Sequence, residues 1–234
     1  MPMLPLGQLR ALVFDLDGVI LDSQKLMRYA LAESFREHCG PGSPPYAGFF
    51  QLMGLPLEGI LSRLGLPQEM AGTYRRVSRE SLHLASPYPG VEELLALSRA
   101  QGLRVGLMTG KERDRTEEML RLFQLWESFE VLVCGDDPLP PKPEPGGLQA
   151  LLASLGERPE HSALIGDSRH DIACARAAGV MALGAGWGFS PAQELNESGA
   201  RITFPSPGAF AEWLSSHAEE KLQPMASHGG RTHE

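Results

Sequence analysis

The most constraining feature of this 234-residue chain is an apolar run that ends in two carboxylates. Residues 9–14 are apolar apart from Arg10, which indicates a buried β-strand, and Asp15 and Asp17 follow directly. Charged groups at the end of a core strand must be paired or bound to a cation, because burying an isolated charge is costly. Gly18 then allows the backbone to turn sharply and a ligand to come close. The stretch therefore predicts two carboxylates at the carboxyl edge of a sheet, in a position suited to a metal ion.

The composition narrows the class of protein and its partners. Hydrophobic residues make up 42% and charged residues 21%, and the length suggests one large domain or a core with an insert. The net charge of −8 argues against nucleic acid or an anionic membrane as a partner, but not against a phosphorylated metabolite. Three widely spaced cysteines form no disulfide or zinc pattern. No run is long enough to span a membrane and residues 1–10 lack a signal-peptide layout, so we expect a cytoplasmic protein. The sequence leaves the oligomeric state open.

Strand-like apolar runs alternate with amphipathic helical patterns along most of the chain. This alternation predicts an α/β fold with a Rossmann-like parallel sheet and right-handed crossovers. In such sheets, ligands bind at the carboxyl ends of the strands. After the first run, the expected strands occupy residues 103–108, 129–134, 162–165 and 180–183. The expected helices occupy residues 24–38, 91–101, 113–122, 148–155, 171–178 and 209–216.

One long segment interrupts this alternation. From residue 23 to residue 85 only helical patterns occur, and clusters rich in glycine and proline bound and divide them. Asp22 and Ser23 offer capping oxygens for the first of these helices. We therefore predict a core domain of residues 1–22 and 86–216, a small helical domain of residues 23–85 and a flexible tail of residues 217–234.

Polar side chains follow four of the predicted strands, which suits the chemistry of phosphoryl transfer. That reaction needs a nucleophile, a proton shuttle, a hard cation and donors for the phosphate oxygens. Asp15 can attack through a carboxylate oxygen, while Asp17 can protonate the leaving oxygen and then deprotonate water. In this scheme Asp15 stays ionised and Asp17 carries the proton. The first of the four clusters is the pair Asp15 and Asp17, and the other three are Thr109, Lys142 and Asp167.

The same clusters supply ligands for a cation and for a phosphate. Mg²⁺ prefers oxygen ligands, which Asp15, Asp167 and the backbone carbonyl of Asp17 can provide. The Thr109 hydroxyl, the backbone amides that follow it and the Lys142 ammonium can hold phosphate oxygens. Asp171 lies four residues after Asp167 and can support the cation through water or orient Lys142.

Together these motifs resemble those of the haloacid dehalogenase (HAD) superfamily, and they occur in the same order. The insert lies where this superfamily places a small helical cap domain. The chain is thus similar to the branch of phosphoglycolate phosphatases and β-phosphoglucomutases. The four motifs are Asp15-Leu16-Asp17-Gly18-Val19 with Asp22-Ser23, then Thr109, then Lys142-Pro143, and last Gly166-Asp167-Ser168-Arg169-His170-Asp171.

The resemblance implies a HAD fold, a Mg²⁺ cofactor and a phosphoaspartyl intermediate on Asp15. The presence of Asp17 favours phosphate esters, because the dehalogenase and phosphonate-cleaving members lack or replace the second aspartate. The predicted function is a phosphatase for a small phosphorylated metabolite, such as phosphoglycolate, a sugar phosphate or an aminoshikimate-type phosphate. A phosphosugar mutase would share every catalytic residue and is the alternative. A non-catalytic binding protein on this fold is a remote alternative, since no catalytic residue is lost.

Other residues enter through the same resemblance. It makes Gly110 a phosphate-binding residue, and Ser168 and Asp171 supporting residues. Gly54-Leu55-Pro56-Leu57, Thr109-Gly110-Lys111 and residues 141–145 resemble, more loosely, phosphatases encoded with 3-amino-5-hydroxybenzoate synthesis. Candidates for substrate contact are Gly54, Lys111 and Arg63. If Lys111 and Arg63 do not contact the substrate, we expect them to be solvated charges on the surface. His170 is expected to take no part.

Overall fold

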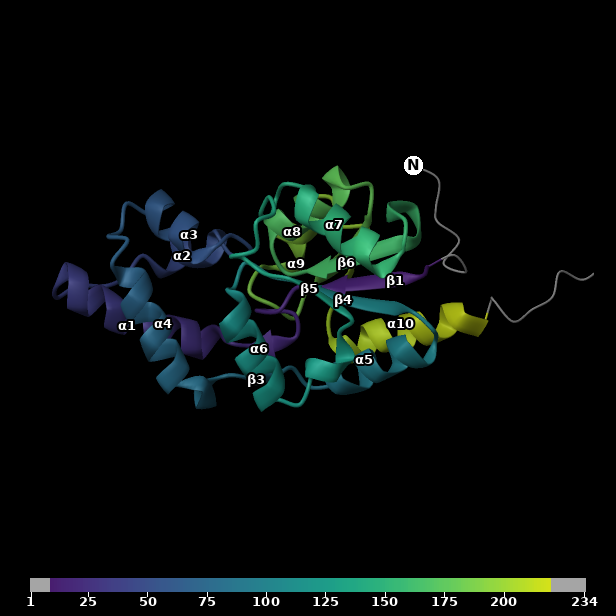
Figure 1. The fold of residues 1–234 in the computed structure, drawn as a ribbon, viewed down its shortest axis with the longest axis horizontal. Coiled ribbons are helices and arrows are strands. Elements are labelled where there is room, and N and C mark those ends of the chain that lie inside the picture. The colour runs from purple at the N-terminus through teal and green to yellow at the C-terminus, as the bar shows by residue number, and fades with distance from the viewer. Residues whose placement is uncertain (1–8, 220–234) are drawn as a thin grey trace, which may run out of the picture.

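The structure is a computed structural model that describes residues 9–219. At its centre is a parallel six-stranded sheet in the order β5-β4-β1-β6-β7-β8 (Figure 1). This confirms the predicted α/β class and all five predicted strands, and it places the first strand between β4 and β6. The strands are β1 (Ala11–Phe14), β4 (Arg104–Met108), β5 (Val131–Val133), β6 (Ser162–Gly166), β7 (Met181–Ala185) and β8 (Ile202–Phe204).

Helices cover both faces of the sheet. As a result, β1 is fully buried and its side chains alternate between two apolar cores. Leu12 and Phe14 belong to a core with apolar residues of α5, α6 and α10, whereas Ala11 and Val13 face a core with those of α7, α8 and α9. Figure 1 shows α7 and α8 on one side of the sheet and α5 and α10 on the other. The bounds are α5 (Val91–Ala100), α6 (Arg113–Leu122), η3 (Trp126–Ser128), α7 (Gly146–Leu155), η4 (Pro159–His161), α8 (Arg169–Ala177), α9 (Ala192–Glu197) and α10 (Pro207–Glu219).

The expected boundary of a tail at residue 217 falls inside α10, which continues to Glu219. The rest of that expected tail, residues 220–234, lies outside the described residues. None of the helices in residues 9–219 combines the length and the apolar character needed to cross a bilayer.

The segment from residue 23 to residue 85 forms helices and no strand in the described structure. Its entry and exit lie side by side, because β2 (Leu21–Asp22) and β3 (Ser86–Pro87) pair antiparallel. The insert has an apolar core of its own, built from residues such as Phe49, Ile60 and Tyr74. Its helices are α1 (Gln24–Cys39), α2 (Tyr46–Gln51), α3 (Leu57–Arg63), α4 (Met70–Glu80) and η2 (Leu82–Leu84).

Three kinds of contact join this insert to the rest of the chain. Arg79 of α4 forms an ion pair with Glu118 of α6 over 2.9 Å, and Arg75 pairs with Glu112. Phe50 packs edge-on against Phe189, with ring centroids 5.4 Å apart. Nδ1 of His170, at the start of α8, lies 2.8 Å from the Met53 carbonyl oxygen. These contacts hold the insert against loops at the carboxyl edge of the sheet.

Candidate active site

The four predicted polar clusters meet at the carboxyl edge of the sheet, and their side chains are buried there. Hydrogen bonds that extend the sheet hold two of them: the Asp15 amide donates to the Ile165 carbonyl (3.0 Å) and the Thr109 amide to that of Val133 (2.9 Å). Because β1 is a central strand, Asp15 has a neighbouring strand on each side. The structure thus brings together side chains that lie far apart in the sequence, as expected for parallel strands.

Lys142 lies at the centre of the cluster with a side chain only 1% exposed. Its Nζ is 3.0 Å from Asp15 Oδ1 and 2.6 Å from Asp171 Oδ1, and it donates to the Met108 carbonyl at 3.1 Å. Three partners match the three donors of an ammonium group. Burial alone would lower the pKa of Lys142, but the two carboxylates outweigh burial and raise it above its usual value. Lys142 is therefore a fixed positive charge beside Asp15.

Asp171 is oriented by the start of helix α8. Its Oδ2 accepts from the amide (3.1 Å) and the hydroxyl (2.5 Å) of Ser168, and its own amide donates to Ser168 Oγ (3.2 Å). This reciprocal arrangement is a capping box, and it starts the helix at Arg169, two residues before the predicted start. With Oδ2 held in this way, the other oxygen of Asp171 faces Lys142. The two expected supporting residues, Ser168 and Asp171, thus act as one unit.

Three buried carboxylates form a set that fits a hard cation. Oxygens of Asp15, Asp167 and Asp171 lie within 4.8 Å of one another, and Asp167 Oδ1 is buried without a hydrogen-bond partner in the described part of the chain. Burial raises the pKa of Asp15 to about 7, with Lys142 opposing and Asp171 adding to the shift. Burial, then Asp171 and Asp15, raises the pKa of Asp167 well above its usual value. A divalent ion with oxygen ligands would compensate this excess of negative charge.

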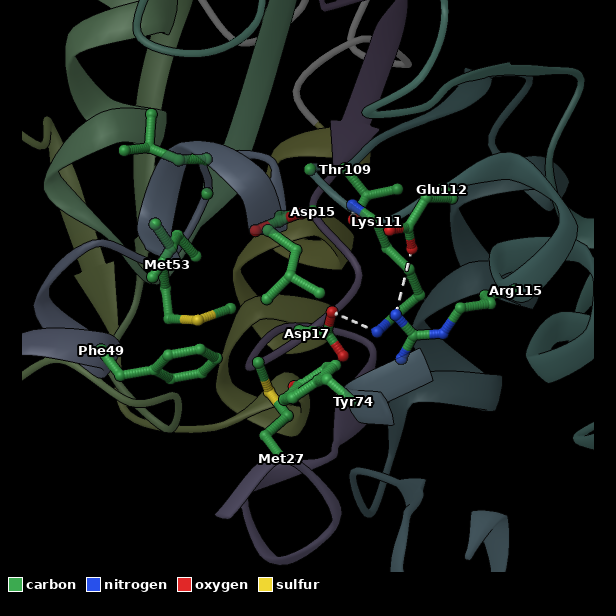
Figure 2. Close-up of a pocket in the computed structure, with 15 residues that line it drawn as sticks. Asp15, Asp17, Met27, Phe49, Met53, Tyr74, Thr109, Lys111, Glu112 and Arg115 are labelled. Atoms are coloured by element: carbon green, nitrogen blue, oxygen red, sulfur yellow. Dashed lines mark hydrogen bonds and ion pairs between the residues drawn. The ribbon is translucent and has the colours of Figure 1, made fainter. Parts of the chain in front are cut away.

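The Asp17 side chain has different partners and is not part of this acidic set. Its Oδ2 is 2.9 Å from Lys111 Nζ (Figure 2). Its Oδ1 accepts from the Ser23 hydroxyl at 2.6 Å. Burial raises the pKa of Asp17, but the Lys111 charge and the Ser23 hydrogen bond outweigh burial and lower it overall. The protein groups alone thus favour the ionised form of Asp17 and the neutral form of Asp15. A cation held by Asp15 and Asp167 would favour ionised Asp15, so the expectation that Asp15 stays ionised while Asp17 carries the proton stays a prediction.

Several other sequence-predicted residues take unexpected positions. Ser23 precedes α1, but its hydroxyl bonds to Asp17 and does not cap the helix. Lys111 is buried rather than solvated, and its amide donates to Thr109 Oγ1 at 3.2 Å. Arg63 is exposed at the end of α3 and does not line the cavity described next. Gly54 does line it and has a φ of +91°.

Between the acidic cluster and the insert lies a cavity of about 420 Å³, part of which is open to solvent (Figure 2). Asp15, Thr109 and Gly110 lie at its base, so a substrate phosphate at Asp15 would have the rest of its molecule against the insert. The insert contributes Met27, Phe49, Met53, Gly54, Leu55, Leu57, Ile60 and Tyr74, and the core adds Asp17, Lys111, Glu112 and Arg115.

The sequence prediction missed Arg115 and the contact that His170 makes. Arg115 is buried, pairs with Glu112 over 3.0 Å and lines the cavity. Its position in the first turn of α6, four residues after Lys111, was the available signal. His170 is buried and contacts the insert at Met53, and the expectation that it takes no part in the chemistry stays a prediction. No local pattern could have revealed that contact, because it depends on how the insert docks.

Gly18 has a positive φ of +83°, and a Cβ there would lie 2.0 Å from Asp167 Oδ2. We expect Gly18→Ala to displace the Asp167 carboxylate and to reduce kcat at least about tenfold, in addition to a backbone strain of about 1 kcal/mol. The matched control is Gly102→Ala, because Gly102 has a φ of +75° but no neighbouring atom within 4 Å of its Cβ position. Thermal unfolding and steady-state kinetics of both variants test this. Equal kcat values for the two would contradict it.

With this geometry in hand, comparisons with known proteins are informative. A sequence profile described as haloacid dehalogenase-like hydrolase matches residues 12–185. Pyrophosphatase PpaX of Halalkalibacterium halodurans is 31% identical over 176 residues, which cover 74% of this chain and 81% of that protein. The phosphoglycolate phosphatase of Rhodospirillum rubrum is 29% identical over 88% of this chain and 90% of its own.

A solved structure shares the fold. The crystal structure of a hydrolase from Pseudomonas syringae superposes with a TM-score of 0.80 at 21% identity, covering 89% of this chain and 98% of its own. The profile match includes Asp15, Thr109, Lys142 and Asp167, the residues that meet at the carboxyl edge of the sheet. Sequence, fold and site agree, and the chain therefore belongs to the family of haloacid dehalogenase-like hydrolases.

Proposed function

We propose that this hydrolase is a Mg²⁺-dependent phosphatase that cleaves the phosphate ester of a small metabolite. The observation that carries the proposal is the buried Asp15 carboxylate, which contacts Lys142, lies in one acidic cluster with Asp167 and Asp171 and lines the cavity between that cluster and the insert. Relatives named as a pyrophosphatase and a phosphoglycolate phosphatase support phosphoryl chemistry. Asp15, Asp167 and the backbone carbonyl of Asp17 would hold Mg²⁺, with Asp171 behind them. When bound, the ion would supply positive charge that offsets the charge of the phosphate.

The chain's own residues account for two chemical steps. An oxygen of Asp15 attacks the phosphorus, the bond from phosphorus to the leaving oxygen breaks, and the phosphoryl group is carried on Asp15. Water then attacks that phosphorus, which releases inorganic phosphate and restores the carboxylate. The Thr109 hydroxyl and the Gly110 amide donate to the phosphate oxygens, and the fixed positive charge of Lys142 beside Asp15 stabilises their negative charge.

The proton shuttle in this scheme is a pair of residues. Lys111 holds Asp17 ionised, which suits Asp17 to take a proton from water in the second step. In the first step, Lys111 is the protonated member of the pair and gives its proton to the leaving oxygen. Ser23 fixes the other oxygen of Asp17, so the carboxylate keeps its orientation in both steps.

The cavity favours a phosphatase over a phosphosugar mutase. A mutase has to hold a doubly phosphorylated intermediate, which needs cations at both ends of the site. None of the insert side chains that line the cavity in the described structure is charged. A panel of sugar phosphates, phosphoglycolate and aminated shikimate-type phosphates separates the two: a phosphatase releases inorganic phosphate, whereas a mutase forms an isomer.

Removing the metal should abolish most of the activity. We expect hydrolysis of p-nitrophenyl phosphate to fall about 100-fold or more after treatment with a chelator, and to return when excess Mg²⁺ is added. The physical reason is that three buried carboxylates beside a phosphate dianion leave Lys142 as the main compensating charge. Equal rates of p-nitrophenol release with and without the chelator would contradict the proposal.

A further inference from the structure

We propose, on the basis of the phosphatase function above, that the alcohol released from the substrate is compact, uncharged and largely apolar, and that it contains a ring. The apolar wall of the insert and the pairing of both cations in the described lining of the cavity, Lys111 and Arg115, carry this inference. Such a substrate differs from pyrophosphate and from phosphoglycolate, after which two relatives of this chain are named.

The insert side of the cavity is built for apolar contact. Its side chains are two thioethers, an aromatic ring, three branched aliphatic groups and a tyrosine, with a glycine between them. Phe49 and Tyr74 pack with ring centroids 5.9 Å apart, so this wall is firmly placed within the insert core. Thioethers contact the edges and faces of rings favourably and adapt to their shape. Met27, Met53 and Phe49 therefore give this side of the cavity apolar groups of the kind that contact a ring favourably.

The cations that line the cavity are already neutralised. Lys111 Nζ lies 2.9 Å from Asp17, with side chains only 4% and 7% exposed. Arg115 lies 3.0 Å from Glu112, which also accepts from Arg75. Among the described residues, the cavity lining holds no cation without a carboxylate partner. A further charge that enters this space loses its hydration and finds no free counter-charge.

The consequence for substrates is a penalty on charged leaving groups. Pyrophosphate would place a second phosphate, and phosphoglycolate a carboxylate, against the apolar wall. Burying either without a partner is costly. Sugars meet a milder form of the same obstacle, because within residues 9–219 Tyr74 is the only polar side chain that the insert contributes to the lining of this cavity. An ester of a cyclic or aromatic alcohol avoids both penalties.

Matched pairs of substrates test this without any mutation. Benzyl phosphate is compared with 4-carboxybenzyl phosphate, and ethyl phosphate with phosphoglycolate, so that each pair differs by one carboxylate. We expect kcat/KM to be about 100-fold higher for the uncharged member of each pair, and higher for benzyl than for ethyl phosphate. Equal or reversed preferences within the pairs would overturn the inference while leaving the phosphatase function intact. If the enzyme hydrolyses none of the four esters and does not hydrolyse p-nitrophenyl phosphate either, the proposed function is overturned, and this inference with it.

A variant then ties the preference to the cavity wall. Met53→Lys keeps an unbranched side chain but adds an unpaired cation, so we expect the preference for benzyl over 4-carboxybenzyl phosphate to shrink about tenfold. Met53→Leu is the matched control and should keep the preference of the wild-type enzyme. The same reduction in both variants would contradict the charge argument. If Met53→Lys fails to fold, the wild-type ratios still decide the inference.

Discussion

Asp15→Asn is expected to lower kcat for p-nitrophenyl phosphate by about 10⁴-fold or more, because an amide cannot act as the nucleophile that a carboxylate provides. The substitution barely changes the shape of the side chain. Burial and Asp171 both oppose ionisation of Asp15, as its raised pKa of about 7 indicates. A neutral side chain at this position is therefore tolerated by the fold, and we expect a thermal midpoint within a few degrees of the wild-type value.

Two measurements separate this outcome from general damage. Asp114 is exposed in the first turn of α6, so Asp114→Asn is a matched control that should retain wild-type kcat. Rapid quenching with a radiolabelled substrate should leave a hydroxylamine-sensitive phosphoryl group on the wild-type protein and none on the Asp15 variant. Normal turnover by Asp15→Asn would exclude the phosphoaspartyl route. A trapped phosphoryl group on another residue would place the nucleophile elsewhere.

The strands and the motif residues were predictable because their signals are local. β1 and β6 are buried on both faces and read as continuous apolar runs, and a candidate site residue, Asp15 or Asp167, directly follows each. β8 escaped prediction, because it consists of only Ile202, Thr203 and Phe204 at the edge of the sheet, and two of them are only partly buried. Short edge strands carry little sequence pattern, since they need neither alternation nor a long apolar run.

The partners of the catalytic residues were not predictable, because they come from distant segments. Asp17 was placed at the site, yet its protonation depends on Lys111, which follows a different strand and folds back onto it. Ser23 looked like a helix cap, but its hydroxyl donates to the buried Asp17 carboxylate, and its oxygen accepts no hydrogen bond from an amide of α1. His170 meets Met53 across 117 positions of the chain. The identity of such contacts is set by how the insert packs on the sheet.

Lys142→Met is expected to reduce both stability and activity. The wild-type ammonium contacts Asp15, Asp171 and the Met108 carbonyl, with almost no exposure to solvent. Its loss leaves two buried carboxylates without their cation, which should lower the free energy of unfolding by about 3–5 kcal/mol. The phosphate would also lose a fixed positive charge, so we expect kcat/KM to fall about 100-fold or more. Denaturant unfolding and steady-state kinetics measure the two effects.

A double variant separates the structural role of Lys142 from its role at the phosphate. In Lys142→Met with Asp171→Asn, one of the two stranded carboxylates is neutral, so part of the lost stability should return. Activity should not return, because the positive charge beside Asp15 is still missing. Lys25→Met is the matched control at an exposed position of α1, and should change the free energy of unfolding by less than about 0.5 kcal/mol. If the double variant regains activity along with stability, Lys142 only supports the fold and does not act on the phosphate.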